Sequence, residues 1–369
     1  MSEVLYKITK TGAVQTWKAW VDGPEVYTEY GQLDGKMQQS TYTAQETNVG
    51  RSNHRNQEEQ ALFELEALYK EQQDNKHYRP TIEQAHEQSD VLIPMKLQNY
   101  KDHSKKIKFP CYVQRKFNGS RRTYVDGKFL SKIGREEENK VPQIGEQLKK
   151  LGVDVDGEVY SHGMSLQEIR SASLKPNENT DKLKLVIFDI PDTTLPFEDR
   201  LKELLRIQQE VDVYLSHEYT AITVETPYLL QSQEELESLF DQVVKDGYEG
   251  VVIRNVGSMF ESGKKSYQTQ KWKPRYDAEA RVVGVEKCKN GTGKLLCEGA
   301  DSLNNVKFKC MMKVKRRDGN EYPRMYEDMK NLIGEWITFS YEELSDKGVP
   351  TKPVGELVRK CNDKGEPLE

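Results

Sequence analysis

A lysine that could act as a covalent nucleophile stands in the stretch QRKFNGSR, residues 114–121. Lys116 ends an apolar run and is followed by an Asn-Gly turn signal. A lysine with an ordinary pKa of about 10.4 is mostly protonated near neutral pH and is then a poor nucleophile. Cationic neighbours favour the neutral amine, and the candidates are Arg115, Arg121 and Lys273. The stretch therefore predicts a nucleophile, with an ordinary hairpin as the alternative.

Five further segments carry residue types that suit nucleotide chemistry. In chain order they are SKIGR (131–135), DGE (156–158), VIFDI (186–190), EGVVIR (249–254) and KWK (271–273). They supply carboxylates, an aromatic ring and cations, the groups that bind metal ions, bases and phosphates. Each segment alone is an ordinary strand end or a solvated edge. The informative signal is that all of them occur, over about 160 residues, in the order found in one known enzyme superfamily.

This ordered set resembles the covalent nucleotidyltransferase superfamily and, within it, the ATP-dependent polynucleotide ligases. The adenylation motif of those ligases, K-x-D-G-x-R, is similar to Lys116–Arg121 here. The resemblance implies an ATP-dependent DNA ligase that uses Mg²⁺ and seals nicks in duplex DNA. Lys116 would take AMP from ATP and pass it to the 5′-phosphate, and the 3′-hydroxyl would then displace AMP.

The same resemblance implies roles for individual residues. The catalytic set is Lys116, Lys271 and Lys273. The nucleotide-binding set is Gln114 at the adenine edge, Phe188 stacked on adenine, Arg121 and Glu158 at the ribose, Arg135, and Lys271 and Lys273 at the α-phosphate. The metal ligands are Glu249 and Glu158. Residues expected to reach nucleic acid are Lys132 and Arg135, beside Ser131, and Lys313, Lys315 and Arg316.

The sequence departs from the family pattern in two places. Asn118 stands where the motif has aspartate, which keeps a hydrogen-bonding oxygen but removes a charge. The basic motif near the carboxy terminus is poorly matched by ELVRKCNDKGEP, where Arg359 and Lys364 are the nearest candidates. We therefore expect no metal ligand at Asn118.

Charge and cysteine content restrict the class of protein. The net charge of −5 excludes a uniformly basic protein, yet basic residues cluster in three blocks. Residues 101–122 hold eight Lys or Arg against one Asp, residues 263–275 hold five and no acid, and residues 306–317 hold six and no acid. The blocks predict a face that binds a polyanion, with solvated loops as the alternative for any single block.

The 369 residues contain no run of about 18 apolar residues and no apolar leader, which argues against a membrane or secreted protein. The five cysteines are scattered and form no C-x-x-C pair, so a zinc site or a disulfide framework is not expected. We expect a cytoplasmic protein that is a monomer and has no membrane partner.

Hydrophobic patterning predicts an α+β protein of three domains. Residues 1–78 read as an antiparallel meander (4–8, 14–20, 26–32, 37–43) followed by a helix over 56–73, in which Leu62 flanks the apolar stripe. Residues 79–276 form the expected mixed α+β nucleotidyltransferase domain. Its strands are expected at 111–116, 121–125, 128–131, 153–160, 183–190 and 250–255, and its helices at 143–151, 165–172, 196–209 and 232–245. Residues 277–369 read as a small OB-fold barrel with strands at 280–286, 294–298, 306–315 and 336–341 and a helix near 326–332.

The amino-terminal region carries a second resemblance. Tyr30-Gly31-Gln32, followed by a polar stretch and a helix, is similar to WGR domains, which bind nucleic-acid ends. Tyrosine stands for the tryptophan and glutamine for the arginine. A spacer module is the alternative.

Three other functions fit parts of the pattern. An RNA ligase or a capping guanylyltransferase uses the same lysine chemistry. A catalytically silent clamp on DNA ends would need only the basic blocks. The joint presence of Lys116, Glu158, Glu249, Lys271 and Lys273 favours the ligase over the clamp.

Overall fold

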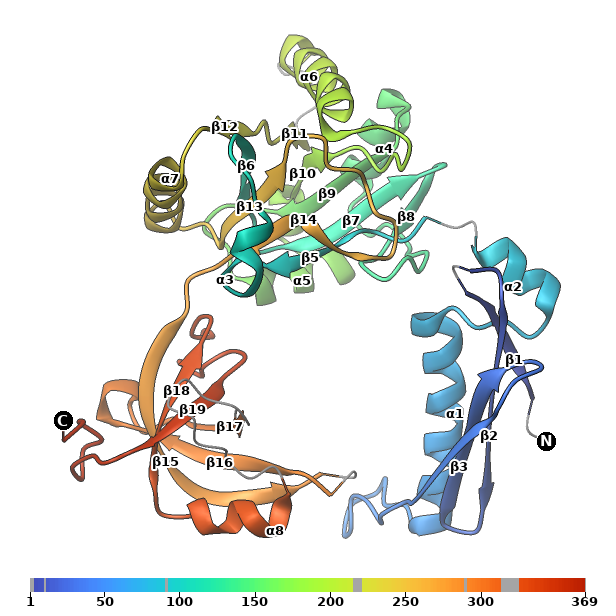
Figure 1. Ribbon diagram of the computed structural model, residues 1–369, viewed down its shortest axis with the longest axis vertical. Helices are drawn as coiled ribbons and strands as arrows, with labels where there is room; N and C mark the ends of the chain where they lie inside the picture. Colours follow the sequence, from blue (N-terminus) through green and yellow to red (C-terminus); the bar gives the residue numbers. More distant parts are fainter. Residues whose placement is uncertain are drawn as a thin grey trace. The chain divides into compact units, whose positions relative to one another are not determined.

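The protein is described by a computed structural model, which covers residues 3–9, 11–89, 92–214, 221–288, 291–312 and 325–368 (Figure 1). The chain forms two compact units. The first comprises Met1–Gln114, Asn118–Gln231 and Ile253–Gln270, and the second comprises Arg115–Phe117, Ser232–Val252 and Lys271–Glu369. In the part of the chain that is described, no helix is long and apolar enough to cross a bilayer.

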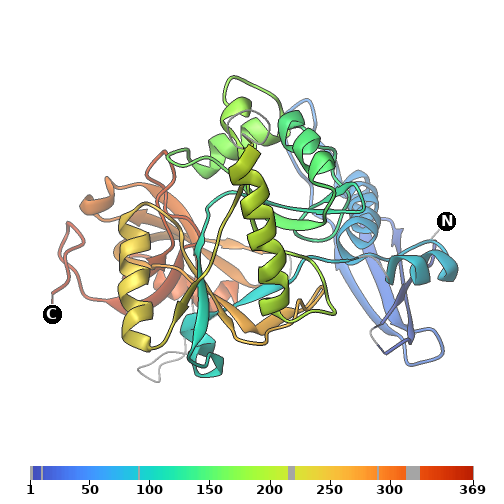
Figure 2. The same ribbon diagram turned by 90° about the horizontal axis from the view of Figure 1, so that it is seen from above.

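The amino-terminal part of the first unit is a four-stranded antiparallel sheet covered by one helix. The strands follow one another in chain order as β1 (Leu5–Ile8), β2 (Val14–Asp22), β3 (Glu25–Gln32) and β4 (Gln38–Thr43). The helix α1 (Gln57–Lys76) lies beside this sheet in both views (Figures 1 and 2). This arrangement confirms the predicted meander and helix.

Local chemistry explains where α1 begins and which face it buries. Asn56 accepts a hydrogen bond from the backbone N–H of Glu59, and the Glu59 carboxylate accepts one from the Asn56 backbone, which is a capping box. The helix packs on a core of sheet residues through its apolar stripe, namely Leu65, Leu68 and Tyr69 against Leu5, Trp17 and Ala19. Leu62, expected at the flank of that stripe, is 55% exposed and points away from the core.

The amino-terminal structure continues past the boundary expected at residue 78. The backbone of Arg79 pairs with that of Tyr6 at 2.7 and 2.8 Å, and helix α2 (Ile82–Ser89) contacts β1. Sequence reasoning missed this extension because the residues around it are polar and resemble a linker. Backbone pairing with a distant strand leaves little trace in local composition.

Two further sheets carry the alternating part of the chain. One has the order β11-β10-β9-β7-β8 and the other the order β12-β6-β13-β14-β5. The strands are β5 (Lys96–Asn99), β6 (Cys111–Lys116), β7 (Ser120–Val125), β8 (Lys128–Leu130), β9 (Val155–Tyr160), β10 (Lys184–Asp189), β11 (Ile222–Val224), β12 (Tyr228–Leu230), β13 (Gly250–Asn255) and β14 (Lys265–Trp272). The helices are α3 (Tyr100–His103), η1 (Ser104–Lys106), α4 (Pro142–Leu151), α5 (Leu166–Leu174), η2 (Thr180–Lys182), α6 (Phe197–Tyr214) and α7 (Gln233–Lys245).

All six strands and four helices predicted for this region are present, with ends that differ by a few residues. Strands β5, β11, β12 and β14 were not predicted. The first three are only three or four residues long, and β14 has the polar sequence KSYQTQKW. Neither type of strand shows the apolar alternation on which sequence reasoning depends.

The strands after residue 275 close into a barrel of order β15-β16-β17-β19-β18. They are β15 (Tyr276–Lys287), β16 (Gly293–Gly299), β17 (Lys307–Met312), β18 (Trp336–Tyr341) and β19 (Val354–Arg359), with η3 (Asp301–Leu303), α8 (Tyr326–Met329) and η4 (Lys330–Leu332) between them. Apolar side chains from every strand but β19 form the buried core, among them Val282, Leu295, Phe308, Ile337 and Phe339. Strand β19 was not predicted, and Lys313, Lys315 and Arg316 lie outside the described residues.

Candidate active site and nucleic-acid surface

Strand pairing brings Lys116 and Glu249 together in the second unit. Lys116 is the last residue of β6, and Glu249 directly precedes β13. The Glu249 N–H donates to the Lys116 carbonyl oxygen at 3.0 Å. The Lys116 Nζ then lies 2.6 Å from Glu249 Oε2, with 20% and 17% of the two side chains exposed. The candidate nucleophile and the candidate metal ligand are therefore direct neighbours.

The group in direct contact with the Lys116 amine is the Glu249 carboxylate, and of the cations expected near it, Arg115 lies elsewhere. The Arg115 guanidinium lies over the Tyr248 ring, 5.0 Å from its centroid, and donates to the Tyr248 hydroxyl at 3.0 Å. Alternation along β6 explains the difference, because consecutive side chains of a strand point to opposite faces. Arg115 and Lys116 therefore cannot share a site.

Glu249 also contacts Lys273, another lysine of the predicted catalytic set. The Lys273 ammonium contacts Glu249 Oε1, and it lies 3.1 Å from Glu342 Oε2. Burial alone would raise the pKa of Glu249, but the positive charges of Lys116 and Lys273 outweigh it and hold the pKa below its ordinary value. Burial likewise would lower the pKa of Lys273, but Glu249 and Glu342 raise it. These groups form a compact cluster of alternating charge.

Lys271 is subject to the charges of the same groups, but the direction of its pKa shift is opposite to that of Lys273. Its pKa is lowered by burial, and the positive charges of Lys273, Lys116 and Lys352 lower it further. Cationic neighbours thus act on Lys271 in the way that we expected for Lys116. Its amine loses a proton at lower pH than an ordinary lysine.

Two glycines allow the backbone around these lysines to pack closely. A Cβ at Gly119 would lie 2.3 Å from the carbonyl oxygen of Val159. A Cβ at Gly250 would lie 2.1 Å from the carbonyl oxygen of Trp272, and Gly250 has a φ of +139°. Only glycine satisfies both demands at residue 250. The glycine after Glu249 therefore holds β13 against the strand that carries Lys271 and Lys273.

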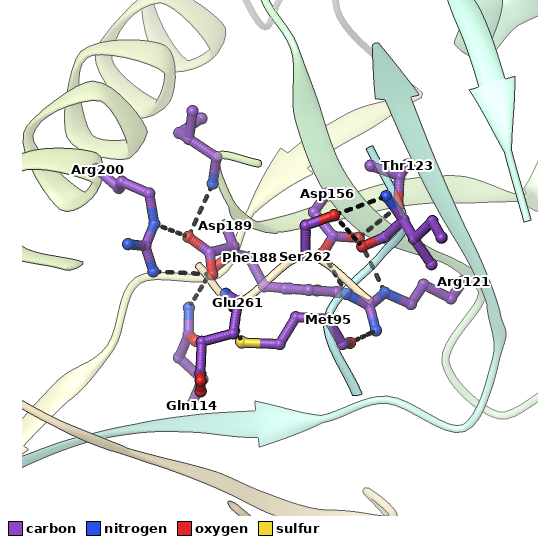
Figure 3. A network of polar contacts seen from close by, with 12 residues as sticks. Met95, Gln114, Arg121, Thr123, Asp156, Phe188, Asp189, Arg200, Glu261 and Ser262 are labelled. Carbon is purple, nitrogen blue, oxygen red and sulfur yellow. Dashed lines mark hydrogen bonds and ion pairs between the residues drawn. The ribbon is translucent and has the colours of Figure 1, made fainter. Parts of the chain in front are cut away.

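In the first unit, Arg121 is held by Asp156 (Figure 3). The guanidinium donates through Nε and Nη2 to the two oxygens of Asp156, and through Nη1 to the carbonyl oxygen of Met95 at 2.5 Å. Thr123 donates to Asp156 Oδ1 at 2.9 Å. The Arg121 guanidinium carbon also lies 5.7 Å from the centroid of the Phe188 ring. Three protein contacts thus fix the plane of a predicted ribose-binding group.

A second carboxylate in this unit holds two buried arginines. Asp189 is 1% exposed and accepts from Arg200 Nε at 2.8 Å and from Arg254 Nη1 at 2.5 Å. Burial would raise the pKa of Asp189, but the two guanidinium groups outweigh it and lower the pKa. Asp156, Asp189 and Arg254 all lie in segments that the sequence analysis singled out. The sequence did not show which of these segments contact one another, because they lie far apart in the chain.

Gln114 occupies a different position from the one predicted. Gln114 is 3% exposed. Its Nε2 donates to the carbonyl oxygens of Phe188 at 2.9 Å and Glu225 at 2.8 Å. Arg254 donates to its Oε1 at 3.4 Å. Both amide hydrogens are therefore used within the protein, so Gln114 does not present its amide to an adenine edge in this structure. It ties β6 to the strand end that carries Phe188.

The other predicted residues of the first unit lie on β9 and after β8. Glu158 is half-buried on β9, opposite Arg121 in the register of β7 and β9. Lys132 is exposed, and Arg135 donates to Glu137 at 3.1 Å with 48% of its side chain exposed. The Ser131 hydroxyl is buried without a hydrogen-bond partner among the described residues. The exposed cations are thus available to a polyanion.

The weakly matched carboxy-terminal candidates lie on the barrel and its tail. Arg359, at the end of β19, has Nη1 3.9 Å from Glu279 Oε1. Lys364 is exposed in the segment that follows. Among the described residues, neither side chain forms a hydrogen bond or ion pair with Lys116, Glu249 or Lys273.

The carboxylates suit Mg²⁺ only in an open arrangement. Within the described ranges there is no group of three or more His, Cys, Asp or Glu side chains that would hold a metal on its own. Mg²⁺ in nucleotide sites typically takes one or two carboxylates and completes its shell with phosphate oxygens and water. Glu249 fits that demand, because both of its oxygens already contact cationic groups.

Folding also unites two of the basic blocks into one surface, here called the lysine patch. Segment α3–η1 is fixed to β14, since Gln270 donates to the His103 carbonyl oxygen at 2.9 Å and the His103 and Tyr267 rings are 5.0 Å apart. Strand β5 joins at the same place, where the Lys96 N–H donates to the Lys264 carbonyl oxygen. The exposed lysines of the patch are Lys96, Lys101, Lys105, Lys106, Lys108, Lys264 and Lys265, with Tyr267 48% exposed among them.

Comparisons with known proteins show what the chain is similar to. The family model described as "ATP dependent DNA ligase domain" matches residues 94–273. A DNA ligase of African swine fever virus (isolate Pig/Kenya/KEN-50/1950) is 27% identical over 360 residues, which span 88% of this chain and 81% of that protein. A DNA ligase of Haemophilus influenzae is 27% identical over 201 residues, or 53% of this chain and 68% of that protein.

The fold has solved counterparts. A structure from an analysis of Lig E DNA ligases covers 73% of this chain and 100% of its own, with a TM-score of 0.59 and 21% sequence identity. At that identity the likeness concerns the fold: mixed α+β with several sheets. The matched ligase domain contains Lys116, Glu249 and Lys273 within its range. Residues 94–273 are therefore similar to the ATP-dependent DNA ligase domain, and most of the chain is similar to viral DNA ligases.

Proposed function

We propose that this protein is an ATP-dependent DNA ligase that seals nicks in duplex DNA through a covalent lysyl-AMP on Lys116. The observation that carries the proposal is the contact between the Lys116 amine and Glu249, at 2.6 Å, with Lys273 on the other oxygen of the same carboxylate. A nucleophile, a carboxylate and a phosphate-binding cation are thus held within one cluster. That is the set of groups that nucleotidyl transfer to an amine requires.

The first step forms one bond and breaks another. The neutral Lys116 amine attacks the α-phosphorus of ATP, the N–P bond forms, the P–O bond to the β-phosphate breaks, and pyrophosphate leaves while the amine proton passes to solvent. Lys271 and Lys273 would stabilise the negative charge on the α-phosphate oxygens.

The next two steps move the adenylate to DNA and close the strand. An oxygen of the 5′-phosphate attacks the phosphorus of lysyl-AMP, which breaks the N–P bond and frees Lys116. The 3′-hydroxyl then attacks the 5′-phosphorus and AMP leaves. Mg²⁺ bound through Glu249, with Glu158 as the second candidate, would neutralise phosphate charge.

Nucleotide contacts in the first unit follow from its fixed groups. We assign the base to the face of Phe188 and the ribose to Arg121 and Glu158. Arg121 supports this role because Asp156 and Met95 fix its guanidinium plane. Gln114 takes the part of a positioning residue, since it holds the Phe188 backbone.

We infer that duplex DNA contacts the lysine patch together with Lys132 and Arg135. Seven exposed lysines give phosphate contacts without base reading, as a ligase that acts at any sequence needs. We also propose the remaining parts of the prediction: a WGR-like domain extended to about residue 89, a nucleotidyltransferase domain to residue 276, an OB-fold domain after it, and a monomeric protein. Lys313, Lys315 and Arg316 stay predicted DNA contacts.

The test is a covalent label from α-phosphate-labelled nucleotide on a denaturing gel. ATP should label the wild type, and GTP and NAD should not. Lys116→Ala should remove the label but leave the folded fraction unchanged, because Glu249 keeps Lys273 as its counter-ion. Lys245→Ala is the matched control, since Lys245 is an exposed lysine at the end of α7 in the same unit. Label on Lys116→Ala would refute the mechanism.

The same gel separates the rival enzymes. A capping guanylyltransferase would take its label from GTP. An RNA ligase would label with ATP and then join nicked RNA faster than nicked DNA, so both duplexes belong in the sealing assay. No label from any nucleotide would leave only the DNA-end clamp.

A further inference from the structure

The barrel supplies a carboxylate that the ligase chemistry described above does not use. Glu342 directly follows β18, and its Oε2 lies 3.1 Å from the Nζ of Lys273. The same oxygen lies 2.6 Å from the Nζ of Lys352, ten residues further along the chain. One carboxylate oxygen is therefore shared between a predicted phosphate-binding lysine and a lysine outside the predicted site.

Burial differs sharply among the three partners. The Lys273 and Glu342 side chains are 12% and 21% exposed, whereas Lys352 is 65% exposed. Charges in partly buried positions are screened less by water and salt than charges on the surface. The contact between Glu342 and Lys273 is therefore the stronger constraint, and Lys352 modulates it from the solvent side.

Glu342 stays charged at any working pH. Burial would raise its pKa, but the hydrogen bonds and positive charges of Lys352 and Lys273 lower the pKa to about 2. A carboxylate oxygen and a phosphate oxygen both accept charge-assisted hydrogen bonds from an ammonium group. Whatever phosphate uses Lys273 must then compete with a permanently ionised Glu342.

We infer that Glu342 is a positioning residue that sets the affinity for ATP by competing with the nucleotide phosphate for Lys273, and that Lys352 weakens this competition by drawing on the same oxygen. The inference rests on the proposed function, because it needs Lys273 to bind a phosphate of ATP. Glu249 remains on Lys273 in either case, so loss of Glu342 does not leave the lysine without a carboxylate.

The inference predicts opposite effects for the two partners of one ion pair. Glu342→Gln keeps the shape but removes the charge, so Lys273 loses one of its two carboxylate partners, and the KM for ATP in lysine adenylation should fall about fivefold, the size of a partly exposed pair. Lys352→Met leaves Glu342 to Lys273 alone, so the KM should rise about threefold. The maximal adenylation rate should change less than about twofold in both, since neither residue touches the reacting atoms.

The double variant tests whether the two effects have a common origin. Lys352 acts only through Glu342 in this scheme, so Lys352→Met should have no effect on KM once Glu342→Gln is present. The control is Glu286→Gln, which neutralises another barrel carboxylate that is paired with a lysine, Lys309. Its KM should equal that of the wild type.

The measurement is the rate of label transfer from α-phosphate-labelled ATP over a range of ATP concentrations, with the whole chain and constant salt. A KM that rises in Glu342→Gln, or a maximal rate that falls severalfold, would show that Glu342 assists catalysis and would overturn the inference. An unchanged KM in Lys352→Met would also overturn it. That variant decides the question if Glu342→Gln does not fold, because Lys352 is exposed.

Failure of the inference and failure of the proposed function give different results. If the wild type takes no label from ATP, the proposed function fails and the inference fails with it. If the wild type is labelled and the variants do not show opposite shifts, only the role of Glu342 is refuted.

Discussion

At the scale of single residues, the molecule repeatedly places one carboxylate between two cations. Glu249 holds Lys116 and Lys273, Glu342 holds Lys273 and Lys352, and Asp189 holds Arg200 and Arg254. The three carboxylates differ in burial, and burial decides what each contact does. The contacts of Glu249 and Glu342 are partly buried, whereas the pairs at Asp189 are fully enclosed and serve the fold.

We predict that Asp189→Asn destabilises the protein by about 3–5 kcal/mol, because it leaves two buried guanidinium groups without their counter-ion. Arg200 is 0% and Arg254 is 3% exposed. Urea unfolding followed by far-UV circular dichroism measures the effect. Asp199→Asn is the matched control, since Asp199 forms an exposed pair with Lys202 and should cost less than about 1 kcal/mol. Equal losses in the two variants would contradict the structure.

The contribution of Asp189 should also depend on pH. The folded pKa of Asp189 is lowered from an ordinary value of 3.8, so the folded state binds fewer protons there than the unfolded chain. The stability that Asp189 provides is therefore complete above the ordinary pKa and is lost as pH falls below about 4. The stability gap between the wild type and Asp189→Asn should be constant from about pH 7 to about pH 5 and should narrow below about pH 4. A gap that widens in acid would contradict the assigned direction.

At the scale of secondary structure, strand ends and short helical turns position the chemistry. Strand β6 ends at Lys116, β13 begins after Glu249, and β14 ends beside Lys273, so the charged cluster lies where neighbouring strands of one sheet terminate. The same sheet, through β14 and β5, supports the lysine patch on α3 and η1. One sheet therefore carries the cluster of Lys116, Glu249 and Lys273 at strand ends and the lysine patch along its edge.

We predict that Lys105→Gln with Lys106→Gln weakens binding to nicked duplex DNA and lowers the slope of log affinity against log salt by about 2, since each lost phosphate contact removes about 0.9. Lys149→Gln with Lys150→Gln is the matched control, because these exposed lysines lie at the end of α4 and outside the patch. Fluorescence anisotropy of a labelled nick over a range of salt gives both slopes. If the control pair lowers the slope as much as the patch pair does, the DNA lies elsewhere.

At the scale of the whole molecule, charge is unevenly divided along the chain. Residues 1–89 hold fourteen Asp or Glu against nine Lys or Arg, and the other 280 residues hold 46 of each. The amino-terminal module therefore carries the whole net charge of −5. Its WGR-like segment has Tyr30 42% exposed, and a Cβ at Gly31 would lie 2.8 Å from the Met37 sulfur. An acidic module attracts a polyanion weakly at best.

We predict that removal of residues 1–89 leaves lysine adenylation unchanged and does not lower the affinity for nicked DNA. The predicted nucleotide-binding residues all follow residue 89, and the deleted part repels phosphate. Adenylation rate and nick affinity of the truncated and whole chains, at two salt concentrations, test both statements. Weaker nick binding by the truncated chain would show instead that the amino-terminal module contacts DNA, as its resemblance to WGR domains implies.

The sequence by itself determined the features that depend on local pattern. Lys116 at a strand end, the order of the nucleotide motifs, the meander with its helix and most strands of the alternating region all follow from apolar periodicity, turn residues and motif spacing. The resemblance to ATP-dependent DNA ligases was also readable from the sequence, because the motifs that carry it are short and contiguous.

Only the tertiary structure decided which charged groups meet. Glu342 is 69 residues from Lys273, and Arg254 is 65 residues from Asp189, so no local pattern links them. Gln114 is a further example. It stands two residues before Lys116 and was expected to reach the adenine edge, but its amide donates to the carbonyl oxygens of two residues that are distant in the chain. Side-chain contacts are set by strand register and burial, and these depend on pairing between segments far apart in the chain.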